Sequence, residues 1–169
     1  VDDPDGDGAP NFIEYLQLSD PTVVDSEALE FGYEQGSFDI YSWSQSGDGS
    51  WIVDQQNPLH GSYSARTVDD QDGSSVLEVT ANTITGRVGF NLETYSLNED
   101  DKLCFIIDET IKGCWNAETE FTSVEYNVSE GEHVFEWEYE CQAPCNGNAW
   151  IDDVFIPVVF GTDIVTQSN

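Results

Sequence analysis

The residues at the start of this 169-residue sequence have the types and spacing of a metal site. Asp3, Asp5 and Asp7 alternate along the chain, Gly8 follows them, and Glu14 completes a run that fits the twelve-residue calcium loop D-x-D-x-D-G-x5-E. A hard cation such as Ca²⁺ takes about six to eight oxygen ligands, which such a loop supplies. The sequence therefore predicts a calcium-binding loop. Its expected ligands are the carboxylates of Asp3, Asp5, Asp7 and Glu14, the backbone carbonyl of Ala9, and a direct or water-mediated contact from Asn11.

A solvated acidic turn is the alternative for these residues, although clustered carboxylates repel one another unless a cation neutralises them. After the loop, only a short helix from about Asn11 to Leu18 fits, because Pro21 soon follows and cannot continue a helix. The stretch from residue 2 to 26 resembles a bacterial thrombospondin type 3-like repeat, and also half of a dockerin repeat. The resemblance implies a calcium-stiffened spacer in a large secreted protein, from which we expect this chain to have been trimmed.

The charge of the chain excludes some partners. Its 34 acidic residues outnumber its 4 lysines and arginines, for a net charge of -30, which repels nucleic acid and anionic membranes. Aromatic residues make up 12% of the chain, which favours a folded domain over a disordered one. We therefore expect the acids to coat a folded surface suited to salty water and in part to ligate metal. No apolar run reaches the length of a membrane span, and we expect the module to be a monomer.

The four cysteines fall into two close pairs, Cys104 with Cys114 and Cys141 with Cys145. Neither spacing suits a redox C-x-x-C motif or a zinc ribbon, so we predict two disulfides. Two apolar arms flank a turn at 108–110, which sets the first pair opposite each other across an antiparallel hairpin. Disulfides persist in oxidising compartments, so we expect a secreted or cell-surface protein.

From residue 28 onward the hydrophobic pattern has a period of two, with short runs separated by Gly, Asn and Asp, which predicts an all-β domain. In 133–140, for example, Phe135, Trp137 and Tyr139 share one face and glutamates share the other. In 87–95 the same rule turns Tyr95 outward. The expected strands are 29–34, 51–54, 63–66, 75–79, 85–95, 102–108, 110–115, 122–128, 133–139 and 149–156.

The order of several motifs resembles a known family. ALEFGYEQG, SGDGSWIVD, HGSYSAR, FNLETY, LCFIIDETIKGCW, GEHVFEWEY and NAWIDDVFIP follow one another as in the bacterial MAM-like jelly roll, a fold shared with many carbohydrate-binding modules. The resemblance implies a two-sheet antiparallel jelly-roll sandwich, preceded by the short calcium loop and helical turn. We therefore expect a calcium-loop segment at 1–26, the sandwich at 27–160 and a tail or linker at 161–169.

The resemblance also implies a structural calcium where the first and last strands lie side by side. Glu34 and Asp152 match its side-chain ligands, and Asp153 is a weaker candidate, as are Asp70 and Asp72. A buried carboxylate without a partner is costly, so Asp152 has an independent reason to be bound. The alternative is that Asp152 accepts hydrogen bonds from backbone amides in a neighbouring loop. Trp51 and Trp150 match tryptophans that pack in the family's core.

Catalytic constellations are missing from the sequence. His60 and His133 are the only imidazoles, and both lie at turns or strand starts, where a surface role is the simpler interpretation. There is no G-x-S-x-G elbow and no glycine-rich phosphate loop. We therefore expect a non-catalytic accessory domain, whose parent protein can still be a secreted hydrolase.

Binding is the remaining class of function, and two kinds of partner stay open. Exposed aromatic rings would stack on the apolar face of a sugar while amides hold its hydroxyls. The candidates are Trp43 with its neighbour Tyr41, Tyr95, Asn146 and Asn148, and for each of them ordinary surface or rim packing is the simpler interpretation. The alternatives are a protein–protein adhesion domain, or a purely structural domain that assists secretion of a protease or other hydrolase. A cluster of exposed aromatics on the wet sheet faces would favour the polysaccharide.

Overall fold

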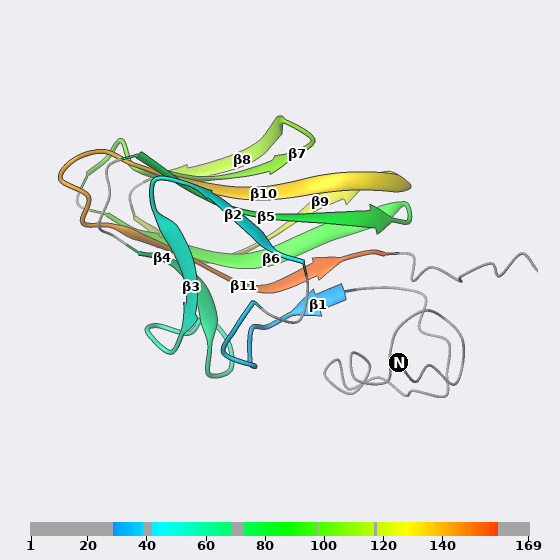
Figure 1. Ribbon diagram of the computed structural model, residues 1–169, viewed down its shortest axis with the longest axis horizontal. Coiled ribbons are helices and arrows are strands. Elements are labelled where there is room, and N and C mark those ends of the chain that lie inside the picture. Colours follow the sequence, from blue (N-terminus) through cyan, green and yellow to red (C-terminus); the bar gives the residue numbers. More distant parts are fainter. Residues whose placement is uncertain (1–28, 39–41, 69–72, 97, 117, 159–169) are drawn as a thin grey trace, which may run out of the picture.

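The computed structural model describes residues 29–38, 42–68, 73–96, 98–116 and 118–158. These residues form two stacked β-sheets, with β8, β7 and β10 in the upper layer of Figure 1 and β11 and β1 in the lower one. The calcium loop at 3–14, the helix expected after it, and Tyr41, Asp70 and Asp72 lie outside the described residues, as do both expected domain boundaries.

The described residues form eleven strands, and every pairing between these strands is antiparallel. One sheet has six strands in the order β3-β4-β11-β6-β9, with β1 also pairing with β11, and the other has five in the order β2-β5-β10-β7-β8. The expected all-β sandwich is therefore confirmed, with its first and last described strands side by side. The six-stranded sheet contains β1 (Leu29–Phe31), β3 (Ser50–Asp54), β4 (Ser64–Val68), β6 (Gly86–Tyr95), β9 (Thr119–Val128) and β11 (Asn148–Ile156). The five-stranded sheet contains β2 (Ser44–Gly47), β5 (Gly73–Thr83), β7 (Lys102–Ile107), β8 (Thr110–Asn116) and β10 (Gly131–Cys141).

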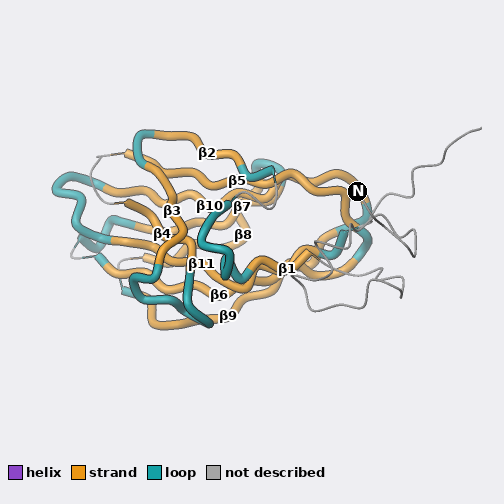
Figure 2. Tube along the Cα trace, turned by 60° about the horizontal axis from the view of Figure 1, so that its bottom comes forward, coloured by secondary structure: helices purple, strands orange, loops and turns teal. Residues whose placement is uncertain are grey.

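Aromatic side chains fill the space between the sheets. The ring of Phe105 on β7 lies 4.8 Å from that of Phe90 on β6 and 5.0 Å from that of Trp137 on β10, measured between centroids. Phe135, Trp137 and Tyr139 are all buried, as the alternation in β10 predicts, and the glutamates between them face outward. Figure 2 shows the same two layers from a second direction. Burial of these rings is the main source of stability for the fold.

Strand β2 was not expected from the sequence. Its residues, Ser44 to Gly47, are polar and exposed, so they carry no alternating pattern. They pair with β5 because the preceding Trp43 packs on the core, 5.7 Å from the ring of Trp137, and so holds the chain against that edge. The hydroxyl of Ser44 also donates to Glu78 across the pair.

The two tryptophans that match the family's core occupy different layers. Trp51 is buried between the sheets, and its indole N–H donates to the carbonyl of Ser75 at 3.0 Å. Trp150 alternates with the core-facing Ala149 and therefore points to the outer side of β11. There its N–H donates to the carbonyl of Gln56 at 2.9 Å, so the loop between β3 and β4 covers it. Both residues pack as expected, but only Trp51 does so in the core.

Both predicted disulfides are confirmed. Cys104 and Cys114 face each other across β7 and β8. Asp108 and Glu109 form the turn between these strands with positive φ, the backbone of a two-residue hairpin turn. The second bridge joins Cys141 to the nearby Cys145, at the end of β10. The described residues contain no helix, and hence none able to cross a membrane.

Alanine substitutions at a buried and at an exposed phenylalanine test which residues belong to the core. Phe105 is fully buried, whereas Phe121 on β9 is 52% exposed. Phe105→Ala should lower the free energy of unfolding by about 3–5 kcal/mol, because it leaves a cavity in the aromatic core. Phe121→Ala should change it by no more than about 0.5 kcal/mol. Urea unfolding measures both, and equal losses in the two variants would contradict this assignment of core and surface.

Candidate ligand-binding face

The outer face of the six-stranded sheet carries exposed aromatic side chains. Tyr95 is 45% exposed at the end of β6, and Phe121 is 52% exposed on the neighbouring β9. Leu92 pairs with Thr122 and Thr94 with Thr119, with a shift of register between them, so Glu93 lies opposite the two-residue segment that contains Phe121. Two exposed aromatic residues therefore lie on neighbouring strands near one glutamate.

The structure brings Tyr95 together with a second predicted binding residue. Tyr95 is the cross-strand partner of Asn148, the first residue of β11. The side-chain oxygen of Asn148 accepts a hydrogen bond from Arg66 at 3.3 Å, which orients its amide. Asn146 is exposed two residues earlier, in the loop that follows the second disulfide. Two of the candidate residues from the sequence, Tyr95 and Asn148, therefore lie side by side on this sheet.

Trp43 does not belong to this face. Its ring is half-buried and lies 5.2 Å from that of Phe31 and 6.0 Å from those of Tyr33 and Phe38. These contacts give Trp43 a packing role, which is the alternative to sugar binding that the sequence left open. The polar residues around Trp43 in the sequence are typical of a surface loop. Its packing partners, Phe31, Tyr33 and Phe38, lie outside that polar run, so the local pattern does not predict these contacts.

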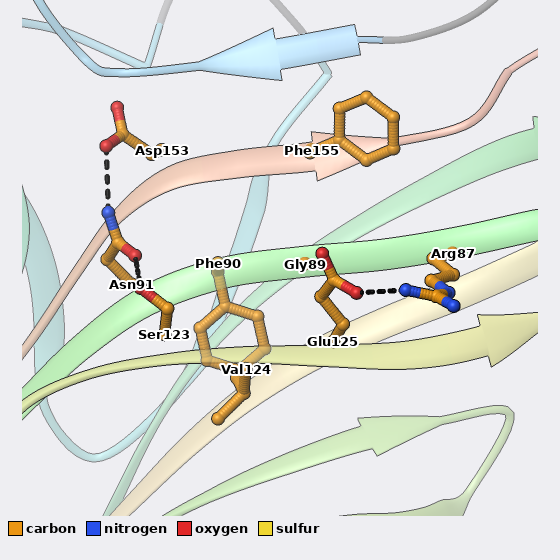
Figure 3. A pocket seen from close by; sticks show the side chains of 9 residues that line it. All are labelled: Arg87, Gly89, Phe90, Asn91, Ser123, Val124, Glu125, Asp153 and Phe155. Carbon is orange, nitrogen blue, oxygen red and sulfur yellow. Dashed lines mark hydrogen bonds and ion pairs between the residues drawn. The ribbon is translucent and has the colours of Figure 1, made fainter.

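Beside the exposed aromatics, the same face is hollowed. The hollow has a volume of about 340 Å³ and lies over β6, β9 and β11 (Figure 3). Gly89 is its cause, because this outward position of β6 has no side chain between its cross-strand partners Phe155 and Glu125. We call it the Gly89 hollow. Its other side chains include Arg87, Asn91, Ser123 and Asp153.

A β-bulge in β11 aims one carboxylate into the Gly89 hollow. The pairing of β11 with β6 shifts register between Asp152 and Phe155, and Asp153 has a φ of 46° there. Such a conformation is unusual for a residue with a side chain, and bulges re-aim side chains. As a result, the amide of Asn91 donates to Asp153 Oδ2 at 2.8 Å. Ser123 in turn donates its hydroxyl to the side-chain oxygen of Asn91.

The other oxygen of Asp153 faces His60 in the loop between β3 and β4. His60 Nδ1 lies 3.2 Å from Asp153 Oδ1. This hydrogen bond is the largest cause of the raised pKa of His60, to which the negative charge of Asp153 adds. His60, Asp153, Asn91 and Ser123 therefore form one chain of hydrogen bonds across the outer face.

The residues expected to hold calcium, Glu34 and Asp152, fasten the same loop. Glu34 accepts from the amides of Ser62 and Tyr63 at 2.9–3.1 Å. Asp152 accepts from the amide of His60 at 3.0 Å, as in the alternative left open from the sequence, and is fully buried. Within the described ranges, no three His, Cys, Asp or Glu side chains are grouped so that they could hold a metal ion.

A serine, a histidine and an aspartate also meet at one end of the sandwich. His133 Nδ1 lies 2.6 Å from Asp108 Oδ2, and His133 Nε2 lies 3.2 Å from the hydroxyl of Ser129. Nε2 is also 3.1 Å from the carbonyl oxygen of Ser129. A carbonyl oxygen only accepts, so a hydrogen bond at this contact uses a proton on Nε2, and a nitrogen that donates there does not also accept from the serine hydroxyl. We infer that these side chains hold two turns together. The amide of Val134 also donates to Asp108, and this hydrogen bond is the main cause of the lowered pKa of Asp108.

The outer face of the five-stranded sheet differs in chemistry. Glu136 on β10 lies directly across from Glu78 on β5. Burial is the main cause of the raised pKa of Glu136, and the charges of Glu78 and Glu138 add to it. The one exposed large hydrophobic side chain on the described part of this sheet is Ile111. The face with Tyr95 and the Gly89 hollow is therefore the better candidate for a ligand.

Solved structures with the same fold include carbohydrate-binding modules and adhesins. TmCBM61 in complex with β-1,4-galactotriose is 20% identical with a TM-score of 0.57, and the match covers 76% of this chain and 94% of that one. The K1 cleaved adhesin domain of Lys-gingipain from Porphyromonas gingivalis W83 is 9% identical with a TM-score of 0.60, covering 78% and 98%.

A further similar structure is the secreted serine protease VesC from Vibrio cholerae. It is 18% identical with a TM-score of 0.51, and the match covers 64% of this chain but 24% of the protease. No protein-family model matches the sequence, and no curated protein is significantly similar to it. The expected likeness to carbohydrate-binding modules is therefore confirmed at the level of the fold, while the MAM-like family and the calcium repeat stay predictions.

The buried carboxylate of Asp152 should make stability depend on pH in the metal-free protein. Burial raises its pKa from 3.8 to about 6, so the folded state binds its proton more tightly than the unfolded state does. The stabilisation is complete below about pH 4 and is lost as the pH rises through 6, a loss of roughly 3 kcal/mol at 1.36 kcal/mol per pKa unit.

Urea unfolding in EDTA between pH 4 and 7 measures this dependence. Asp152→Asn should remove the contribution of Asp152 to the change of the unfolding free energy with pH. Glu99→Gln removes a carboxylate at an exposed position, so it should keep the wild-type pH dependence and controls for the change in net charge. A slope that is the same in all three proteins would contradict the assignment to Asp152.

Proposed function

We propose that this chain is a non-catalytic, calcium-binding accessory module of a large secreted bacterial protein and that it binds carbohydrate through the outer face of its six-stranded sheet. The observation that carries the proposal is the pair of exposed rings, Tyr95 and Phe121, on neighbouring strands. An aromatic face packs against the apolar C–H face of a pyranose, and nearby polar groups bind its hydroxyls. Glu93 and Asn148 are the polar groups beside these rings.

The comparisons support this proposal through the fold. A fold alone does not assign a function, because one sandwich serves many kinds of ligand. The exposed rings of this chain add to its likeness with TmCBM61, which was solved in complex with β-1,4-galactotriose. Two disulfides and the likeness to a secreted protease support a secreted location.

Calcium at the junction of β1 and β11 is part of the proposal. Glu34, Asp152 and Asp153 would supply carboxylate oxygens, the donors that Ca²⁺ prefers. In the described residues these carboxylates are not grouped around a metal position, so binding would require Glu34 and Asp152 to exchange hydrogen bonds with the loop for the cation. The buried hydroxyl of Tyr33 has no hydrogen-bond partner in the described part of the chain, and the charge of Asp152 raises its pKa further than burial alone does. An unpaired buried group of this kind fits a junction that holds a polar ligand. Bound calcium would neutralise these carboxylates, and the loop at Asp3 to Glu14 would hold a second ion.

Removal of calcium should therefore lower the melting temperature. An ion at a hundredfold over its dissociation constant stabilises the native state by about 2.7 kcal/mol, which EDTA removes. Glu34→Gln should weaken the effect at the junction, and Asp5→Asn should weaken it at the N-terminal loop. Calorimetric titration with calcium gives the stoichiometry of each protein, and an EDTA melting curve that overlays the calcium curve would refute the metal sites.

Retention on polysaccharides tests the binding function. We expect the protein to be retained on one class of insoluble polysaccharide in calcium, and Tyr95→Ala and Phe121→Ala each to weaken retention about 3- to 10-fold through loss of a stacking ring. Ile111→Ala is the matched control, because Ile111 is also an exposed large hydrophobic residue but lies on the other sheet. Retention on none of the polysaccharides, in calcium or EDTA, would contradict the proposal.

A second candidate function is adhesion to a protein. The outer face of the five-stranded sheet favours it, because Glu78, Glu136 and Glu138 gather negative charge there, which suits a cationic partner. Similar structures include adhesin domains of Lys-gingipain. Binding that depends on Glu136 and is lost in salt, without any binding to polysaccharide, would favour this function.

A further inference from the structure

The Gly89 hollow is a built polar site next to the aromatic rings, and its groups are already held in place. We propose that it is a sugar subsite, which binds one neutral pyranose unit of the polysaccharide through two neighbouring hydroxyl groups. This inference rests on the proposed carbohydrate-binding function and adds the place and the chemistry of recognition.

Hydrogen bonds fix the orientation of the central amide in the hollow. Asn91 donates one N–H to Asp153 Oδ2 at 2.8 Å, and its oxygen accepts from Ser123. The two contacts together determine which end of the amide is nitrogen. Figure 3 shows this side chain between the other two. A ligand therefore meets a preorganised site, which lowers the entropy that binding must overcome.

The groups that remain free match a pair of hydroxyls. Asn91 keeps its second N–H as a donor, because an amide nitrogen has two. The hydroxyl oxygen of Ser123 keeps its acceptor capacity, and the carboxylate of Asp153 keeps lone pairs beyond its contacts with Asn91 and His60. A donor flanked by two acceptors suits neighbouring hydroxyl groups, since each hydroxyl both donates and accepts.

Charge in the hollow selects against anionic ligands. Asp153 and Glu125 both line it, and Arg87, the one lysine or arginine among its described lining residues, lies 2.7 Å from Glu125 in an ion pair. A uronate or a phosphate would meet two carboxylates and a guanidinium that is already paired, in a chain of net charge -30. A neutral sugar avoids this repulsion.

The apolar wall and the size of the hollow suit the rest of a sugar ring. Phe155 is half-buried and forms one wall, where the C–H face of a pyranose can pack. The volume of about 340 Å³ lies within the range of small-molecule sites. Gly89 keeps the floor open, because a Cβ there would lie 3.3 Å from Glu125 Cγ.

One extended ligand can reach both the hollow and the aromatic rings. Gly89, Asn91, Glu93 and Tyr95 are successive outward residues of β6, and six steps of about 3.4 Å place the last about 20 Å from the first. A chain of a few sugar units laid along β6 would stack on Tyr95 at one end and place a hydroxyl pair in the hollow at the other.

Calorimetric titration of the 169-residue chain with xylotriose, cellotriose, β-1,4-galactotriose and trigalacturonate tests the subsite in calcium buffer. For the neutral trisaccharide that binds best, Asn91→Leu should raise the dissociation constant about 10-fold and Ser123→Ala about 3-fold, through lost hydrogen bonds. Ser44→Ala is the matched control, because Ser44 is also exposed and hydrogen-bonded to a side chain, but on β2. Amide NMR adds a direct readout, in which the side-chain NH₂ signal of Asn91 should move on titration.

Each outcome decides between the two proposals. Loss of affinity in Asn91→Leu and Ser123→Ala, with Ser44→Ala unchanged and trigalacturonate bound more weakly, supports the subsite. Unchanged affinity in both hollow variants, while Tyr95→Ala weakens binding, overturns the subsite and leaves carbohydrate binding in place. If no neutral trisaccharide binds, or if the chain binds only polylysine at low salt, both proposals fail.

Discussion

The pairing of β11 with three other strands is the constraint on which the rest of the structure depends. β11 lies between β4 and β6 in the six-stranded sheet and also pairs with β1. Ala149 and Ile151 hold it to the core, while Trp150 and Asp152 turn to the outer side under the loop that follows β3. A slip of one residue would exchange these two sets and place a buried carboxylate in the aromatic core. The register of one strand therefore sets both the packing and the outer face.

The bulge in β11 turns Asp153 to the outer face, where it takes part in the Gly89 hollow. Without the shift between Asp152 and Phe155, strict alternation would turn the residue after Asp152 toward the core. With it, Asp153 adopts a positive φ and reaches Asn91, so consecutive aspartates serve different parts of the molecule. Asp152 holds the neighbouring loop, and Asp153 organises the Gly89 hollow. Strain in a strand is tolerated where the surrounding pairing enforces it, and such strain often accompanies functional sites.

The two outer faces of the sandwich divide the chemistry of the surface. On the five-stranded sheet, Glu78 and Glu136 lie directly opposite each other, and two like charges in this position do not stabilise the strand pair. The charge of Glu78 adds to burial in raising the pKa of Glu136. The six-stranded sheet instead presents aromatic rings, amides and a hollow. The same fold appears in carbohydrate-binding modules and in adhesin domains, so the faces, and not the fold, distinguish the possible partners of this chain.

Local patterns in the sequence determined which residues point inward and where the covalent links form. The alternation in 133–140 placed Phe135 and Trp137 in the core, and two apolar arms around a turn placed Cys104 opposite Cys114. These features follow from the two-residue period of a strand, which depends only on neighbours in the chain. Tertiary structure alone decided that polar residues at 44–47 form a strand, that Trp43 packs inward, and that Asp153 meets Asn91. Each of these depends on pairing between segments far apart in the sequence, and a bulge or an edge pairing leaves no periodic trace in either segment.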